Sequence, residues 1–319
     1  MAAFVKLLFI EQENTELRYE RAALLIFQNG ARVTSVPIDS LERIIVAPHV
    51  VLSAGVLGFI ASHQVGLLVV NCRYPDRTAM LCGMLKTDVR RRVQQYKLLE
   101  DSVFRLHWST QIVFTKTLRQ YKLLLNAVTT RPDIRLDLTH AIEQLNTALS
   151  VLKKENTVDS LASLRGIEGA ASACYFHAYS KLFAPQLNFN HRNRRPPSDP
   201  VNACLSLAYT LIHHEAVTAL RIVGLDPAVG CYHELYYNRE SLACDLIEAL
   251  RPLIDGWLWQ LFRENVLRVE HFTTNDGACY LNKAGKQHFY AAYYQQVLAW
   301  RKLLRRYAQT AVKAMIHAH

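Results

Sequence analysis

Three segments of the chain carry side chains whose types suit a divalent metal. Glu168 stands at the start of a predicted helix over Gly166–Phe183, and His233 lies in an irregular segment before a later helix. Asp245 and Glu248 are three residues apart, so both side chains point to one face of that helix. Carboxylates with one imidazole suit Mn²⁺ or Mg²⁺, and the histidine favours Mn²⁺. These residues are therefore candidate metal ligands.

Each candidate also has an ordinary structural interpretation. Glu168 alone is typical of a capping or solvent-facing acid, although Gly166 and Gly169 leave room beside it for another backbone or a ligand. His233 alone is typical of a hydrogen-bonded structural histidine. An Asp and a Glu three residues apart most often form a solvated helix face. Because ligands so distant in sequence have no fixed spacing, these residues alone indicate only a candidate metal site in a basic helical domain.

The charge of the chain is unevenly distributed. Half of the 319 residues are hydrophobic and 20% are charged, which excludes a disordered or low-complexity protein. The formal net charge is +10, but residues 1–90 carry nine basic and eight acidic side chains, so residues 91–319 hold +9 of it. This excess favours a polyanionic partner, although solubility alone also explains it. The runs Arg90–Arg92 and Arg301–Arg306 are therefore either solvated helix faces or phosphate contacts.

The cysteines and the N-terminus bear on the cellular compartment. Seven cysteines form no CxxC pair, which argues against a zinc ribbon and a disulfide framework. The N-terminus lacks the order of basic, apolar and small residues that marks a signal peptide. The uncharged stretch Ile44–Cys72 is interrupted by Pro48, polar residues and glycines, so we expect buried core there rather than a membrane span. We therefore expect a cytoplasmic protein with reduced thiols.

The periodicity of apolar residues changes near residue 86. Residues 4–85 consist of short apolar runs separated by turn signals, of which Asn29-Gly30 predicts a hairpin turn, and they predict a small β-sandwich. From about Asp88 apolar residues recur at three- and four-residue spacings, which predicts helices. The expected fold class is α+β, with a β-sandwich over residues 1–85 and a mainly α-helical domain over residues 86–319.

The individual elements follow from these patterns. The predicted strands are Phe4–Ile10, Arg21–Phe27, Ala31–Ile38, Leu41–Val46 and Leu67–Val70, with a further hairpin over Phe272–Leu281. The predicted helices are Ala54–Ser62, Val89–Glu100, Val103–Val128, Leu136–Leu152, Gly166–Phe183, Pro200–Val223 with Asp199 as its N-cap, Glu240–Ala249, Leu253–Leu267 and Lys286–Lys313.

Four motifs over residues 165–255 resemble, in the same order, those of the CRISPR-associated adaptation integrase (Cas-one) family. They are Glu168-Gly169 with Tyr175-Phe176; Arg192 and Arg195-Pro196-Pro197 leading into Asp199-Pro200-Val201-Asn202-Ala203; Gly224-Leu225-Asp226-Pro227 with Gly230 and His233; and Arg239, Ser241-Leu242, Asp245, Glu248 and Arg251-Pro252. Small departures, such as Cys231-Tyr232 before His233, remove no candidate ligand.

The resemblance implies roles for both domains and for individual residues. It implies a homodimer that assembles through the β-sandwich, and a helical domain with integrase and nuclease activity. Carried over to this chain, the metal ligands are Glu168, His233 and Glu248, and the catalytic residues are these three together with Asp245, which lies close by. The candidates for DNA contact are Arg192, Arg195, Asn202, Arg239 and Arg251.

The implied reaction is the insertion of spacer DNA at a repeat array. A 3′-hydroxyl of a duplex fragment attacks a phosphodiester while bound Mn²⁺ or Mg²⁺ acts as a Lewis acid, and water as nucleophile makes the same site an endonuclease. The implied partners are double-stranded DNA and the small ferredoxin-like Cas-two protein. Two alternatives stay open: a nuclease selective for branched DNA with the same residues, and a non-catalytic scaffold that binds nucleic acid.

Overall fold

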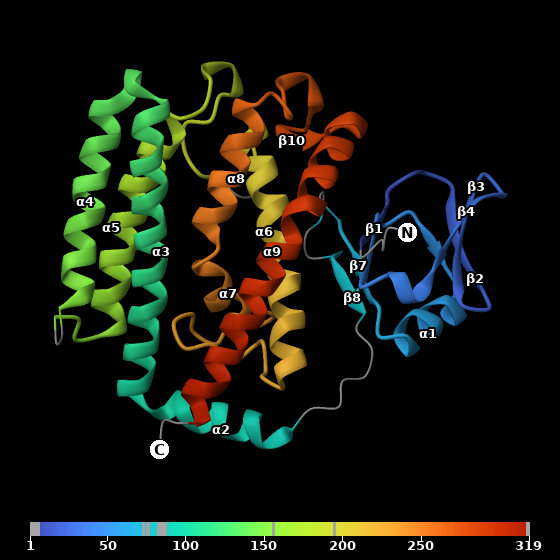
Figure 1. Cartoon of the computed structure of the whole chain (residues 1–319), viewed down its shortest axis with the longest axis horizontal. Coiled ribbons are helices and arrows are strands. Elements are labelled where there is room, and N and C mark those ends of the chain that lie inside the picture. Colours follow the sequence, from blue (N-terminus) through green and yellow to red (C-terminus); the bar gives the residue numbers. More distant parts are fainter. Residues whose placement is uncertain are drawn as a thin grey trace. The chain divides into compact units, whose positions relative to one another are not determined.

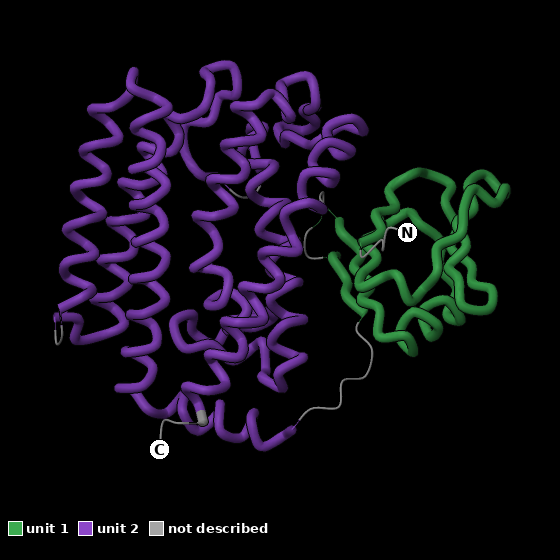
Figure 2. Tube along the Cα trace, viewed as in Figure 1, with its two compact units in different colours: residues 1–86 green, residues 87–319 purple. Residues whose placement is uncertain are grey.

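The computed structural model describes residues 7–71, 74, 77–81, 88–154, 157–193 and 196–316. The chain divides into two compact units, residues 1–86 and residues 87–319 (Figure 2). Strands dominate the first unit and helices the second, so the predicted α+β class is confirmed. Arg195 and the first residues of the strand predicted from Phe4 lie outside the described residues.

The described strands of the first unit form two sheets, ordered β1-β5-β7-β8 and β4-β3-β2-β6. One hydrophobic cluster joins them, since it includes Ile10 of β1, Leu24 of β3 and Ile44 of β5, together with Ile60 of α1. The elements are β1 Leu7–Ile10, β2 Thr15–Glu20, β3 Ala23–Gln28, β4 Ala31–Pro37, β5 Arg43–Val46, β6 Val51–Leu52, α1 Ala54–Ser62, β7 Gly66–Val69 and β8 Ala79–Leu81.

The hairpin and the buried stretch behave as the sequence predicts. Asn29 and Gly30 have φ values of 51° and 80°, as a tight turn between β3 and β4 requires. The described part of the uncharged stretch from Ile44 folds into short strands and α1, and in the described residues no helix has both the length and the apolar character needed to cross a membrane. Strand β2 was not predicted, because only Thr15 and Leu17 of its six residues are buried.

The second unit consists of helices with one hairpin, and the predicted elements are confirmed to within a few residues. Asp88, Asp101 and Asp199 cap α2, α3 and α6 by accepting hydrogen bonds from backbone N–H groups of the first turn. The elements are α2 Val89–Glu100, α3 Ser102–Thr130, α4 Arg135–Lys153, α5 Leu161–Ser180, α6 Pro200–Val223, α7 Ser241–Glu248, α8 Arg251–Arg263, β9 Phe272–Asn275, β10 Ala278–Leu281 and α9 Lys283–Ile316.

Two groups of helices build this unit (Figure 1). Helices α3, α4 and α5 pack side by side, and α6 contacts α7, α8 and α9. Helix α3 also contacts α7 and α8, so it links the two groups. Glu168 lies well inside α5, which begins at Leu161, and the expectation that it stands at a helix start is wrong. The candidate ligands Glu168 and Glu248 therefore come from helices α5 and α7, both of which contact α3, and His233 comes from the loop before α7.

Candidate functional site

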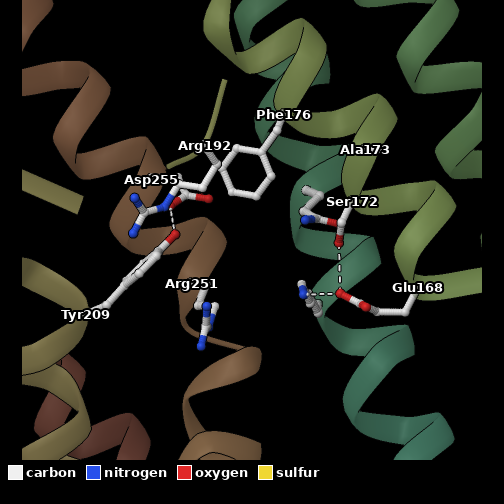
Figure 3. Close-up of a pocket in the computed structure, with 10 residues that line it drawn as sticks. Glu168, Ser172, Ala173, Phe176, Arg192, Tyr209, Arg251 and Asp255 are labelled. Carbon is white, nitrogen blue, oxygen red and sulfur yellow. Dashed lines mark hydrogen bonds and ion pairs between the residues drawn. The ribbon is translucent and has the colours of Figure 1, made fainter. Parts of the chain in front are cut away.

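Lys116 on α3 brings the candidate carboxylates together. Its ammonium makes an ion pair with Glu168 of α5 and another with Glu248 of α7, where Nζ lies 2.8 Å from Oε2. The Glu168 carboxylate also accepts a 2.8 Å hydrogen bond from the Ser172 hydroxyl (Figure 3). On its other side, Glu248 Oε1 lies 3.0 Å from Arg251 Nε. Two residues far apart in the sequence thus meet at one buried point.

Asp245 positions His233 and does not join the carboxylate pair directly. Its Oδ2 accepts hydrogen bonds of 2.7 and 3.0 Å from the backbone N–H groups of Cys231 and Tyr232. Its Oδ1 lies 2.7 Å from His233 Nδ1 and accepts a further bond from the His233 backbone. This fixes the imidazole with Nε2 toward Glu248, 3.9 Å from Oε1. A carboxylate that orients a histidine in this way is typical of metal sites.

Gly230 permits the close approach on which these bonds depend. A Cβ atom there would lie 2.7 Å from the backbone carbon of Ser241 and 2.9 Å from Asp245 Oδ2, which is closer than side chains tolerate. The loop can therefore lie directly on the start of α7 only with glycine at this position. The space beside Gly166 and Gly169 is open, in agreement with the room expected next to Glu168.

The charges of Lys116 and Glu248 shift each other's pKa values. Burial alone would raise the pKa of Glu248, but the positive charges of Arg251 and Lys116 outweigh it and lower that pKa to about 2. Burial alone would lower the pKa of Lys116, but the carboxylates of Glu248 and Glu168 raise it overall. Lys116 and Glu248 are thus buried charges that stabilise each other.

The donor set fits a divalent cation, with Lys116 lying between the carboxylates. Within the described residues, no three His, Cys, Asp or Glu side chains are arranged to hold a metal as they stand. Glu248 Oε2 is buried, and the Lys116 ammonium lies 2.8 Å from it. Two carboxylates and the Nε2 atom of His233 are ligands that Mn²⁺ and Mg²⁺ accept.

Two cavities adjoin the cluster. One, of about 420 Å³, is lined by Lys116, Glu168 and Arg251 together with Arg192, Tyr209 and Asp255 (Figure 3). The other, of about 450 Å³, is lined by the same three residues with His233, Arg165 and Arg239. Both cavities therefore combine Glu168 with Lys116 and with two or more arginines, and these positive charges suit an anionic substrate.

Asp255 anchors the first cavity. Its carboxylate accepts a 2.8 Å hydrogen bond from the Tyr175 hydroxyl and another from the Tyr209 hydroxyl. Complete burial raises the pKa of Asp255 to about 6, although both hydrogen bonds act in the opposite direction. The sequence motifs include Tyr175 but give no role to Asp255.

The residues expected to contact DNA differ in their availability. Asn202 is fully buried and bonds to Asp199, so it stabilises the chain near the start of α6 and is not open to DNA. Arg192 donates a 2.7 Å hydrogen bond to Asn202, and Arg251 is engaged with Glu248. Arg239 donates to Ser241 Oγ and to the backbone of Glu234, and it lines the second cavity.

The basic runs are of mixed character. Arg301 is buried and paired with Glu215, so the expectation that the whole run Arg301–Arg306 faces solvent or phosphate is wrong at this position. Arg305 and Arg306 are exposed. Arg90 pairs with Asp88, and its side chain is 91% exposed.

Lys116 is a side chain of the candidate site that the sequence interpretation missed. A signal for it existed, because Ser109, Lys116, Thr117 and Gln120 are buried on the same face of α3 as Val113 and Leu124. Polar residues at the core-facing positions of an amphipathic helix indicate a buried polar site.

Comparison with known proteins identifies the family. The model of the family described as "CRISPR associated protein Cas1" matches residues 8–295. The chain belongs to the Cas1 family. The resemblance to the Cas-one family seen in its motifs is thereby confirmed, and the match extends into the strand-rich unit.

Individual Cas1 proteins match over nearly the whole chain. The relative named CRISPR-associated endonuclease Cas1 1 from Thermodesulfovibrio yellowstonii is 36% identical over 299 residues, which cover 93% of either chain. CRISPR-associated endonuclease Cas1 3 from Thermus thermophilus is 29% identical over 330 residues, covering 98% of this chain and 94% of the relative.

Solved structures share the fold at lower sequence identity. A Cas1 protein from Thermotoga maritima has a TM-score of 0.81 at 20% identity, covering 98% of this chain and 97% of its own. A casposase bound to an integration product has a TM-score of 0.80 at 21% identity, covering 97% of this chain and 91% of its own.

Proposed function

We propose that this Cas1 chain is a CRISPR adaptation integrase that inserts spacer DNA at a repeat array, and a DNA endonuclease when water is the nucleophile. The observation that carries the proposal is the meeting of Glu168, Glu248 and His233 at one point in a basic helical unit. The name endonuclease among the relatives and the integration product in a structural neighbour support it.

In this proposal Glu168, Glu248 and His233 hold Mn²⁺ or Mg²⁺. When bound, the metal supplies Lewis acidity at the phosphoryl group under attack. Asp245 accepts the Nδ1–H of His233, so the ring presents the Nε2 lone pair to the site. Arg251 lines both cavities and adds positive charge where phosphoryl oxygens gain negative charge.

The bonds made and broken balance without an energy source. The 3′-hydroxyl of the incoming DNA loses its proton and forms a phosphodiester, while the attacked phosphodiester releases a 3′-oxygen that takes up a proton. One phosphodiester replaces another, so no nucleoside triphosphate is needed, and no P-loop occurs in the sequence. With water as nucleophile, the same exchange leaves a cut strand.

The assembly is part of the same proposal. The β-sandwich over residues 1–85 forms the contact between two copies of the chain, and residues 86–319 carry out catalysis. The excess of +9 over residues 91–319 holds duplex phosphates without reading sequence. A small ferredoxin-like Cas2 protein completes the complex, and a structural neighbour titled Cas6-RT-Cas1–Cas2 complex, with a TM-score of 0.80 at 17% identity, supports this partner.

A strand-transfer assay tests the proposal. A fluorescent duplex and a supercoiled plasmid that carries the repeat are incubated with the protein, with and without Mn²⁺. Joined product that requires Mn²⁺ and is lost in Glu248→Gln supports the integrase. Nicked or linear plasmid alone favours a nuclease on branched DNA, and a mobility shift without chemistry favours a scaffold.

A further inference from the structure

Lys116 is buried deep in the helical unit and paired on two sides. It is 9% exposed, and its ammonium bridges Glu168 and Glu248, with 2.8 Å between Nζ and Glu248 Oε2. Lysine is almost never buried to this extent unless it is paired. One ammonium here serves two carboxylates that reach the site from different helices, α5 and α7.

The pair of carboxylates needs a cation between its members. The buried carboxylate of Glu248 and the partly buried carboxylate of Glu168, whose side chain is 21% exposed, repel each other, and an uncompensated buried charge is among the most destabilising features of a fold. Arg251 reaches Glu248 through Oε1 at 3.0 Å, on the side away from Lys116. Lys116 is thus the group that holds Glu168 and Glu248 toward each other.

A metal bound by these carboxylates uses the oxygens that Lys116 now occupies. An ammonium has three donors and no lone pair, so it cannot ligate a cation and instead competes with it for the same oxygens. The ammonium has room to leave, because Lys116 lines both adjoining cavities and its four-carbon stem is flexible.

We propose that Lys116 is an internal counter-ion that keeps Glu168 and Glu248 in place in the metal-free protein and that a divalent metal must displace. This inference rests on the proposed function, since it takes both carboxylates as metal ligands. Lys116 is then a positioning residue that also sets the metal affinity, because every binding event includes the free energy of breaking its two ion pairs.

The test measures Mn²⁺ affinity directly, from the electron paramagnetic resonance signal of free Mn²⁺. Lys116→Met and Lys116→Gln should bind Mn²⁺ roughly tenfold more tightly than the wild type, a gain of about 1.4 kcal/mol. Their metal-free melting temperatures should fall, and Mn²⁺ should raise them by more than it raises that of the wild type. Lys116→Gln replaces the ammonium by an amide that can still donate hydrogen bonds to the carboxylates, so it is the variant to measure if Lys116→Met does not fold.

Lys181→Met is the matched control. Lys181 pairs with a single carboxylate, that of Asp137 at 2.6 Å, and its side chain is 35% exposed. This variant should bind Mn²⁺ as the wild type does. A general effect of removing a paired lysine would appear in both positions, whereas displacement by the metal appears only at Lys116.

The possible outcomes separate this inference from the proposed function. Equal or weaker Mn²⁺ binding by the Lys116 variants overturns the inference alone, provided that the wild type binds Mn²⁺ and Glu248→Gln does not. If neither the wild type nor any variant binds Mn²⁺, the metal site itself is wrong and both proposals fail. Tighter binding confined to the Lys116 variants supports the inference.

Discussion

Two groups of buried charges in the helical unit differ in how they are balanced. Arg301 of α9 reaches Glu215 of α6 with two hydrogen bonds of 2.8 and 2.7 Å, so one guanidinium matches one carboxylate. In the other group a single ammonium, that of Lys116, serves both Glu168 and Glu248. The first pair is geometrically matched, whereas in the second cluster one ammonium bridges two carboxylates and Arg251 adds a second positive charge beside Glu248.

The two groups also differ in their access to cavities. The Lys116 cluster lines two cavities, and Ser172, Arg251 and His233 surround its carboxylates. The Arg301 pair is closed, with side chains 7% and 5% exposed. A buried ion pair by itself therefore says little about function. An ammonium that bridges two carboxylates beside a cavity, in contrast, indicates a binding site.

The largest effect should come from removing a candidate ligand. Glu168→Ala, His233→Ala and Glu248→Ala should each lower the rate of strand transfer by more than about 100-fold, because loss of a ligand costs more than the 10–100-fold typical of groups that only orient ligands. DNA binding, measured by fluorescence anisotropy, should remain, because the excess positive charge is unchanged. Full Mn²⁺-dependent activity in any one variant would show that its residue is not a ligand.

Breaking the matched pair should affect stability and leave the chemistry intact. Arg301→Met leaves the Glu215 carboxylate buried without its guanidinium, which should lower the free energy of unfolding by about 3–5 kcal/mol. Replacing both residues, as Glu215→Leu with Arg301→Met, should recover most of this loss. Urea denaturation measures the stability, and the rate per folded molecule should equal that of the wild type. A reduced rate per folded molecule would mean that the pair also serves the site.

The partly buried pair of His213 and Glu240 should make stability depend on pH. Burial lowers the pKa of His213, but hydrogen bonds to Cys244 and Glu240 outweigh this and raise it from 6.5 to about 9. The imidazolium therefore stabilises the fold fully below pH 6.5, and this contribution is lost as the pH rises toward 9. Melting curves between pH 6 and pH 9.5 should show a loss on the order of 2–3 kcal/mol that His213→Gln lacks. An equally steep loss in the variant would contradict the role of His213.

The smallest effect concerns the arginine at the rim of the second cavity. Arg239→Ala should reduce the slope of log DNA affinity against log salt by about 0.9 if Arg239 contacts one phosphate. Arg301→Met is the control, because its guanidinium is buried and should leave the slope unchanged. An unchanged slope in Arg239→Ala would show that Arg239 contacts no phosphate and only makes its hydrogen bonds with Ser241 and the Glu234 backbone.

Local patterns predicted most of the fold. Helix α2 has the predicted bounds of Val89–Glu100, and Asp199 caps α6 as predicted, because caps and apolar periodicity act within a few residues. The sequence did not predict strand β2, because half of its residues are exposed and its buried and exposed residues do not alternate over its full length. Contacts between residues that are distant in the sequence could not be predicted in this way, because no local pattern encodes them.

In the candidate site, too, residue types could be predicted from the sequence, whereas their contacts could not. Glu168, His233 and Glu248 were named from motifs, and the structure brings them together. Lys116 was missed because its partners lie on other helices, and the role of Asp245 became clear only when four hydrogen bonds placed it against the loop that carries His233. Residue type predicts the chemistry of a group, but its partners follow from the fold.

Anomalous X-ray diffraction from crystals grown with Mn²⁺ would locate the metal itself. An anomalous peak should lie in contact with the carboxylates of Glu168 and Glu248 and with His233 Nε2, and the Lys116 ammonium should be turned away from its position between the carboxylates. Saturating Mn²⁺ with no peak there, and Lys116 still bridging the two carboxylates, would contradict the proposed metal site.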